Sequence, residues 1–132
     1  MALTDPIEQQ LLQVLFGRIN PTMPATLYFG LSSTAIAEDA TGATEPVGGA
    51  YARVAIPNNV TNFPFSAGRI TNGTVIQFPT PTAAWGAAAY WFAADLPSGG
   101  TVHIRGSVSP TQSFNTGERP YFDTGALTIT MD

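Results

Sequence analysis

Short runs of β-type residues, broken every few positions by Gly or Pro, constrain the fold of this chain more than any other feature. Gly and Pro together make up 24 of the 132 residues, with 13 Gly and 11 Pro. These residues separate the runs as turn punctuation. Within the runs, apolar residues such as Val102 and Ile104 alternate with polar ones, which places them on one face of a half-buried strand.

These runs predict six strands and two weaker ones. Many short strands separated by turn residues are typical of an antiparallel β-sandwich or a jelly-roll-like barrel, and both fit the pattern. Residues 97–100, Pro-Ser-Gly-Gly, predict a hairpin-like turn because Gly readily adopts positive φ. The six runs are residues 25–32, 51–56, 69–78, 87–94, 101–108 and 127–131, and the weaker two are residues 63–65 and 120–122.

The start of the chain instead predicts one short amphipathic helix. Asp5 is the expected N-cap, Pro6 fits the first helical position and Glu8 completes a capping box. Gly17, followed by Arg18, should end the helix. A helix of about a dozen residues is marginal in water, so its apolar side chains must pack on the chain's own β-core or on a neighbour. These side chains are Ile7, Leu11, Leu12, Val14, Leu15 and Phe16.

Two parts follow from this division. Residues 1–20 form the amphipathic helix and its linker, and residues 21–132 form a single β-domain of ordinary size. Within the β-domain, residues 33–49 show no periodicity and predict a long exposed loop, a kind of segment that often carries contacts.

The charge content is low and scattered. Only 11% of residues are charged, against roughly 25% in average soluble domains. There is no Lys, the five Arg are dispersed and the net charge is −4, so we expect no nucleic-acid partner. Without Cys there is no disulfide, thiolate chemistry or Cys-type zinc site. Small side chains cost little entropy to order, which favours subunit contacts and predicts a homo-oligomer.

No set of residues predicts catalysis. His103 is the only His and lies in an alternating run, so it is interpreted as structural. The carboxylates do not indicate a catalytic pair of the glycosidase type, because they fall in different turns; they are Asp95, Glu118 and Asp123. A calcium site using Asp95 or Asp123 is an alternative to solvated turn carboxylates, but no EF-hand spacing supports it. We expect no enzymatic activity, no metal and no cofactor.

The N-terminus lacks the basic and apolar regions of a signal peptide, and the most apolar stretch, residues 83–94, is too short and rich in Ala to span a bilayer. We expect no membrane partner, and synthesis and assembly in a cytoplasm.

Trp85, Tyr90, Trp91 and Phe92 form the densest aromatic cluster. Trp is frequent both in cores and in binding hot spots. On one strand, Tyr90 and Phe92 share a face and Trp91 lies on the other. Either both faces are covered, or a ring meets a partner or a ligand. We predict a partner interface that combines apolar side chains of the helix with the two tryptophans. Its residues are Ile7, Leu11, Leu12, Leu15, Phe16, Trp85 and Trp91.

A series of short motifs follows in a fixed order, nearly from end to end. Each is weak alone, but their order and spacing are specific together. They are Met1-Ala2-Leu3-Thr4 with its helix, Leu27-Tyr28-Phe29-Gly30-Leu31-Ser32, Gly48-Gly49-Ala50-Tyr51-Ala52-Arg53, Ile70-Thr71-Asn72, Phe78-Pro79-Thr80-Pro81-Thr82-Ala83-Ala84-Trp85-Gly86, Asp95-Leu96-Pro97-Ser98-Gly99-Gly100, Gly106-Ser107-Val108 and Gly125-Ala126-Leu127-Thr128-Ile129.

In these motifs the chain resembles a family of short tailed-bacteriophage virion proteins usually named tail fibre proteins. The resemblance implies a non-enzymatic structural protein of the virion, made in the bacterial host cytoplasm, whose partners are other phage virion proteins. The oligomer it suggests is a homo-oligomer, with a trimer as the candidate.

Three functions fit these expectations. The first is a tail fibre or tail-associated appendage module anchored by the helix over residues 6–16. The second is a capsid cement or decoration protein that stabilises the head shell. The third is a carbohydrate-binding module that stacks a host-surface glycan on Trp85 or Trp91. Copy number per particle separates the first two, and glycan binding tests the third.

Overall fold

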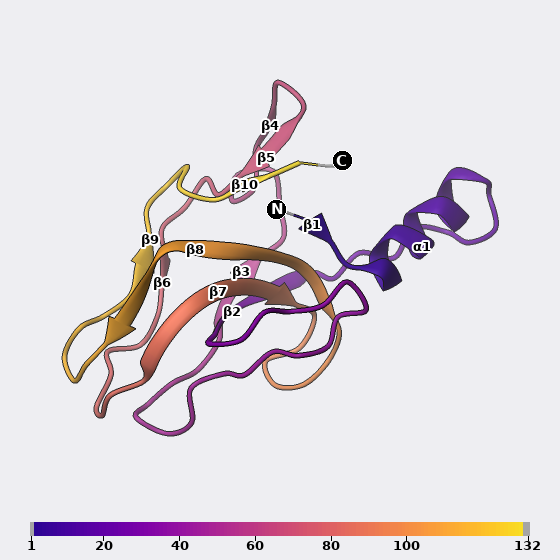
Figure 1. The fold of residues 1–132 in the computed structure, drawn as a ribbon. Coiled ribbons are helices and arrows are strands. Elements are labelled where there is room, and N and C mark those ends of the chain that lie inside the picture. The colour runs from indigo at the N-terminus through magenta and orange to yellow at the C-terminus, as the bar shows by residue number, and fades with distance from the viewer. Residues whose placement is uncertain (1, 131–132) are drawn as a thin grey trace.

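The computed structural model describes residues 2–130, which form three antiparallel β-sheets and one helix (Figure 1). The largest sheet has five strands in the order β1-β8-β7-β2-β3, and the other two have the orders β10-β5-β4 and β6-β9. The five strands are β1 (Ala2–Leu3), β2 (Thr26–Ser32), β3 (Val54–Pro57), β7 (Gly86–Ala94) and β8 (Val102–Phe114); the others are β4 (Phe65–Ser66), β5 (Arg69–Thr71), β6 (Ile76–Gln77), β9 (Tyr121–Phe122) and β10 (Thr128–Ile129), and the helix is α1 (Asp5–Leu15).

The main core lies between the five-stranded sheet and the two smaller sheets. Alternate residues of β2, Leu27, Phe29 and Leu31, enter this core together with residues of β6 and β7. Phe29 stacks on Phe63 and on Trp91, with ring centroids 5.9 and 6.0 Å apart. The large sheet is open and ends at β1 and β3. The structure is therefore the predicted antiparallel sandwich with a short N-terminal helix, and it is not a closed barrel.

Residues 33–49 form an exposed loop, as predicted, and part of this loop also covers the opposite face of the large sheet. Most of their side chains are exposed, but Ile36 is buried against Phe92, Ala94 and Val102. Arg105 Nη1 donates to the Ile36 carbonyl at 2.6 Å. Because this segment forms a second covering layer, aromatic residues on both faces of β7 are buried.

The helix begins one residue earlier than the sequence predicts. Thr4, rather than Asp5, is the N-cap, and its hydroxyl makes no capping bond. That hydroxyl is buried and donates to the Val102 carbonyl at 2.6 Å, because β1 draws Thr4 into the sheet. The predicted end is confirmed. Gly17 has φ 66°, and the amides of Gly17 and Arg18 donate to Val14 and Gln13, which is a Schellman motif.

Each predicted run overlaps a strand, but the bounds differ. The run 69–78 divides into β5 and β6, and β8 continues beyond residue 108 to Phe114. Residue 131 of the last run lies outside the described residues. The turn at residues 97–100 is confirmed, since β7 and β8 pair in antiparallel fashion on either side of it. The short strand β1 has no counterpart in the prediction, and it lies within the segment predicted as helix and linker.

Candidate attachment surface

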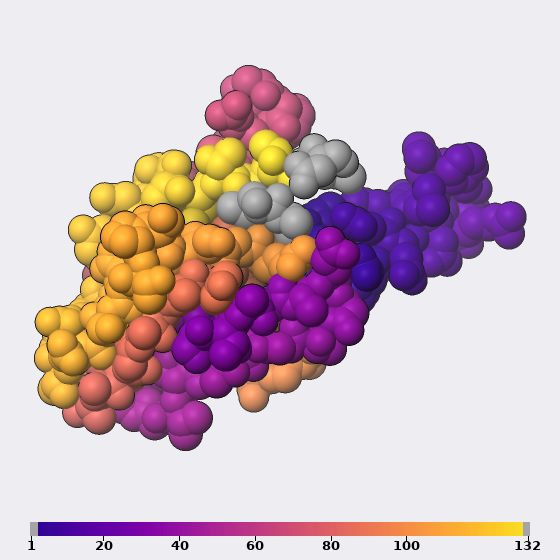
Figure 2. All heavy atoms as spheres, in the orientation of Figure 1, coloured from indigo at the N-terminus to yellow at the C-terminus, as the bar shows by residue number. Residues whose placement is uncertain are grey.

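Helix α1 packs only partly on its own chain. None of its residues is buried, and Ile7 and Leu11, on its first two turns, are half-buried. Farther along, Leu12, Leu15 and Phe16 expose 59%, 75% and 71% of their surface. Figures 1 and 2 show α1 and the segment after it extending beyond the sheets at one end of the molecule. Three large apolar side chains thus stand free on a projecting helix.

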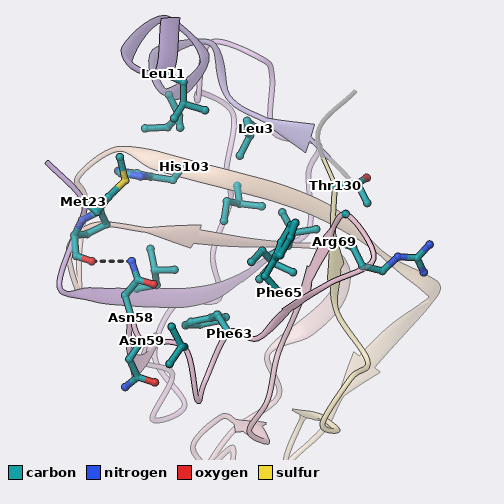
Figure 3. A pocket seen from close by; sticks show the side chains of 18 residues that line it. Leu3, Leu11, Met23, Asn58, Asn59, Phe63, Phe65, Arg69, His103 and Thr130 are labelled. Carbon is teal, nitrogen blue, oxygen red and sulfur yellow. Dashed lines mark hydrogen bonds between the residues drawn. The ribbon is translucent and has the colours of Figure 1, made fainter. Parts of the chain in front are cut away.

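An apolar groove of about 660 Å³ opens beside the base of this helix (Figure 3). Its floor consists of residues at the edge of the main core, including Leu27, Phe63 and Ile104. A hydrogen bond of 3.0 Å from Asn58 Nδ2 to the Pro24 carbonyl joins two segments of its wall. The full lining is Leu3, Ile7, Leu11, Met23, Pro24, Leu27, Asn58, Asn59, Val60, Phe63, Phe65, Gly68, Arg69, Ile70, His103, Ile104, Ile129 and Thr130.

Exposed apolar residues continue around the groove. Met23, Val60 and Phe65 line it and are more than half exposed. Phe65 lies on the β4–β5 hairpin, which projects from the sandwich (Figure 2). Large patches of exposed apolar residues mark interaction sites on soluble proteins. We call the set Leu12, Leu15, Phe16, Met23, Val60 and Phe65 the attachment surface.

The structure does not bring the two tryptophans to this surface. Trp91 is 1% exposed and lies in the main core. Trp85 is also buried, donates its Nε1 hydrogen to the Gly49 carbonyl at 2.8 Å and meets Tyr51 edge-on. Of the predicted interface residues, Leu12, Leu15 and Phe16 lie on the surface and Ile7 and Leu11 border the groove, whereas Trp85 and Trp91 present no free ring to a partner or a sugar.

Two glycines make room for the aromatic rings on β7. A Cβ atom on Gly106 would lie 2.5 Å from the Trp91 indole, and one on Gly30 would collide with the Phe92 ring. Both glycines are cross-strand partners of the rings above them. The alternative that the aromatic cluster packs in the core under two covering layers is therefore the one that the structure adopts.

A charged cluster fastens the covering layer to the sheet. The Arg53 guanidinium, 6% exposed, forms two hydrogen bonds of 2.9 Å with the Glu45 carboxylate. It also donates to the Leu96 and Gly99 carbonyls. The bond to Glu45 raises the pKa of Arg53, and burial together with a bond to the same carboxylate raises the pKa of Tyr51. Since Arg53 already has partners on several sides, we interpret this cluster as structural.

The remaining candidate residues have structural surroundings. His103 Nε2 lies 3.5 Å from Asp95 Oδ2, and Asp95 Oδ1 accepts the Thr101 amide hydrogen at 2.8 Å. Among residues 2–130, no group of three or more His, Cys, Asp or Glu side chains gathers in a way that could hold a metal ion. In the same part of the chain, no helix has both the length and the apolar character needed to cross a membrane.

Comparison with known families decides the identity. The family model described as podophage GP4 fiber I protein gp80 matches residues 2–130. The chain belongs to this family. No curated protein matches it. The resemblance found in the sequence motifs is confirmed, and the chain is a structural protein of the phage virion.

Membership in this fibre family gives the attachment surface a context. A virion protein works in association with other virion proteins, so some of its surface must be covered in the particle. An exposed apolar surface is what such a contact requires. The family is one of structural fibre proteins, and no residue of the site described above requires a catalytic explanation.

Proposed function

We propose that this protein is a tail fibre or tail-associated appendage module that attaches to the virion through its attachment surface. The observation that carries the proposal is the state of α1, a helix of 11 residues of which none is buried. An isolated helix of this length is marginal in water. Its apolar end therefore needs a second surface, and an apolar helix or loop of another virion protein would supply it.

The energy available from this contact is substantial. Burying a fully exposed Leu or Phe side chain contributes about 1.5–3 kcal/mol. Because Leu12, Leu15 and Phe16 are already partly covered, together they would contribute roughly 3–6 kcal/mol before the costs of association. The groove is lined by Ile7 and Leu11 of the same helix and would admit further side chains of the partner. A homo-oligomer, with a trimer as our candidate, would present several attachment surfaces at once. Once one of them is bound, the others bind at a high effective concentration, which strengthens the attachment as a whole.

The position of the surface favours an appendage over a cement protein. Helix α1, which carries the exposed Leu12 and Leu15, projects from one end of the molecule (Figure 2), as expected of a module attached end-on. A capsid cement protein, the alternative, would be present in hundreds of copies per virion, and an appendage in few. Quantitative mass spectrometry of purified virions separates the two.

The attachment itself is tested by particle incorporation. The triple variant Leu12→Ser, Leu15→Ser, Phe16→Ser should be absent from purified virions while the soluble protein keeps its β-sheet spectrum. The control changes two exposed apolar residues that lie outside α1 and the groove, Val47→Ser and Val75→Ser. Incorporation of the α1 variant at the wild-type level would refute attachment through α1.

A further inference from the structure

A second cleft of about 540 Å³ lies between the far half of β8 and the segment around β9. In Figure 1, β9 and this part of β8 are at the end of the sandwich opposite α1. The volume is in the range of small-ligand pockets. Its lining residues are Leu31, Trp91, Ser107, Val108, Ser109, Gln112, Phe114, Arg119, Pro120, Tyr121, Phe122, Asp123, Ala126 and Leu127.

A large bulge in β8 coincides with this cleft. On β7, Ala88 pairs with Gln112 and Tyr90 pairs with Ser107, so Ala89 alone lies opposite the four residues 108–111. The extra residues push β8 out of the regular ladder, and bulges of this kind redirect side chains at the edges of sheets and beside functional sites. Ser107, Ser109 and Gln112 line the cleft from this part of β8.

The polar lining combines donors and acceptors with balanced charge. Arg119 contributes a cation and Asp123 a carboxylate, while Gln112 and the serines can both donate and accept. Arg119 Nε donates to the Phe78 carbonyl, which positions the guanidinium. Within residues 2–130, no hydrogen bond occupies the side chains of Gln112 or Asp123 or the terminal nitrogens of Arg119. These groups are free to meet a ligand.

Aromatic side chains complete the lining. Tyr121 is 58% exposed, and Phe114 and Phe122 are partly buried. A sugar ring has an apolar C–H face that packs on aromatic surface, and hydroxyl groups that each donate and accept. From this combination we infer that the cleft binds a neutral saccharide, with hydroxyls on Gln112, Arg119 and Asp123 and the ring against aromatic surface.

Other ligand classes fit the cleft less well. An anionic ligand would meet the Asp123 carboxylate beside the single cation of Arg119, in a chain of net charge −4. An extended peptide could add to β8 only through a regular edge, and the bulge together with Pro110 interrupts that edge. Trp91 also lines the cleft but is only 1% exposed, so the aromatic ring offered to a sugar is Tyr121 rather than Trp85 or Trp91.

Saturation-transfer NMR on the full chain tests the inference. The probes are the neutral disaccharides maltose, lactose and cellobiose, the acidic sugar sialyllactose and an unstructured neutral decapeptide. We expect transfer to at least one neutral sugar and at least a tenfold loss of affinity in Tyr121→Ala and in Gln112→Ala. The matched control Phe65→Ala, an exposed aromatic residue on the attachment surface, should bind like the wild type.

Three results would overturn the proposal. They are binding to none of the neutral sugars, binding only to the acidic sugar or the peptide, and neutral-sugar binding that survives both substitutions. If Tyr121→Ala perturbs folding, the affinity of the Gln112→Ala variant decides the test, because the Gln112 side chain is exposed. The test uses the isolated protein and residues remote from α1, so its failure would leave the proposed attachment to the virion unaffected.

Discussion

At the level of single residues, Trp91 and Phe92 of β7 show which features of the packing can be predicted from the sequence and which cannot. Alternation along the strand places Trp91 and Phe92 on opposite faces, as the structure confirms. The sequence does not show what covers the second face, because residues 33–49 lack periodicity and Ile36 is a single apolar anchor. The fit also depends on Gly30 and Gly106, whose partners are known only once the strand register is known.

The contact between Gly106 and Trp91 predicts a steric penalty. Gly106→Ala places a Cβ atom 2.5 Å from the indole, so the ring or the strand must shift, and we expect a loss of about 1–3 kcal/mol in the free energy of unfolding. Urea denaturation measures it. The neighbouring Ser107→Ala should stay within about 0.5 kcal/mol, and equal stability of the two variants would contradict the packing described.

The Tyr51 phenol predicts a loss of stability at alkaline pH. Burial raises the pKa of Tyr51 in the folded protein, while in the unfolded chain it is about 10. The neutral phenol therefore contributes its stability fully below pH of about 10, and that contribution is lost as the pH rises further. Tyr51→Phe should lose less stability between pH 9 and 11 than the wild type in thermal denaturation, and an identical dependence would refute the raised pKa.

At the level of elements, the helix was the most predictable and the groove the least. Pro6, the apolar spacing and Gly17 are local signals, so the extent of α1 follows from the sequence almost to the residue. The groove is assembled from segments as distant as Leu3, Phe63 and Ile129, and no local pattern brings these together. Strand β1 cannot be predicted from the sequence, because two residues carry no period. Its pairing with β8 displaces the N-cap to Thr4.

The contrast between α1 and β2 predicts opposite effects on stability. Leu27→Ala removes a buried side chain and should cost about 2–5 kcal/mol, whereas Leu15→Ala, at a position 75% exposed, should change stability by no more than about 0.5 kcal/mol. Equal losses in chemical denaturation would place α1 in the core. Point variants are preferable to deletion of residues 1–17, which would also remove β1 and the buried Thr4.

At the level of the whole molecule, α1 and β9 lie at opposite ends of the structure (Figure 1), so the projecting helix and the β8–β9 cleft are far apart. The attachment surface is apolar, whereas the β8–β9 cleft has both polar and aromatic lining residues. This arrangement suits a module that is fixed to the virion at one end and accessible to a ligand at the other. The sequence alone predicts the virion role through family motifs. It does not predict that α1 and the β8–β9 cleft lie at opposite ends, because their positions depend on how the sheets place α1 and the bulge of β8.

Attachment through α1 requires that the helix is in contact with another protein in the virion. A photo-crosslinking amino acid at Leu15 in intact particles measures this, with Val47, 97% exposed in the covering layer, as the reference position. We predict a crosslink from position 15 to a protein of the tail assembly. A position 15 that crosslinks to no virion protein would contradict attachment through α1, and a crosslink to the major capsid protein would contradict the tail location.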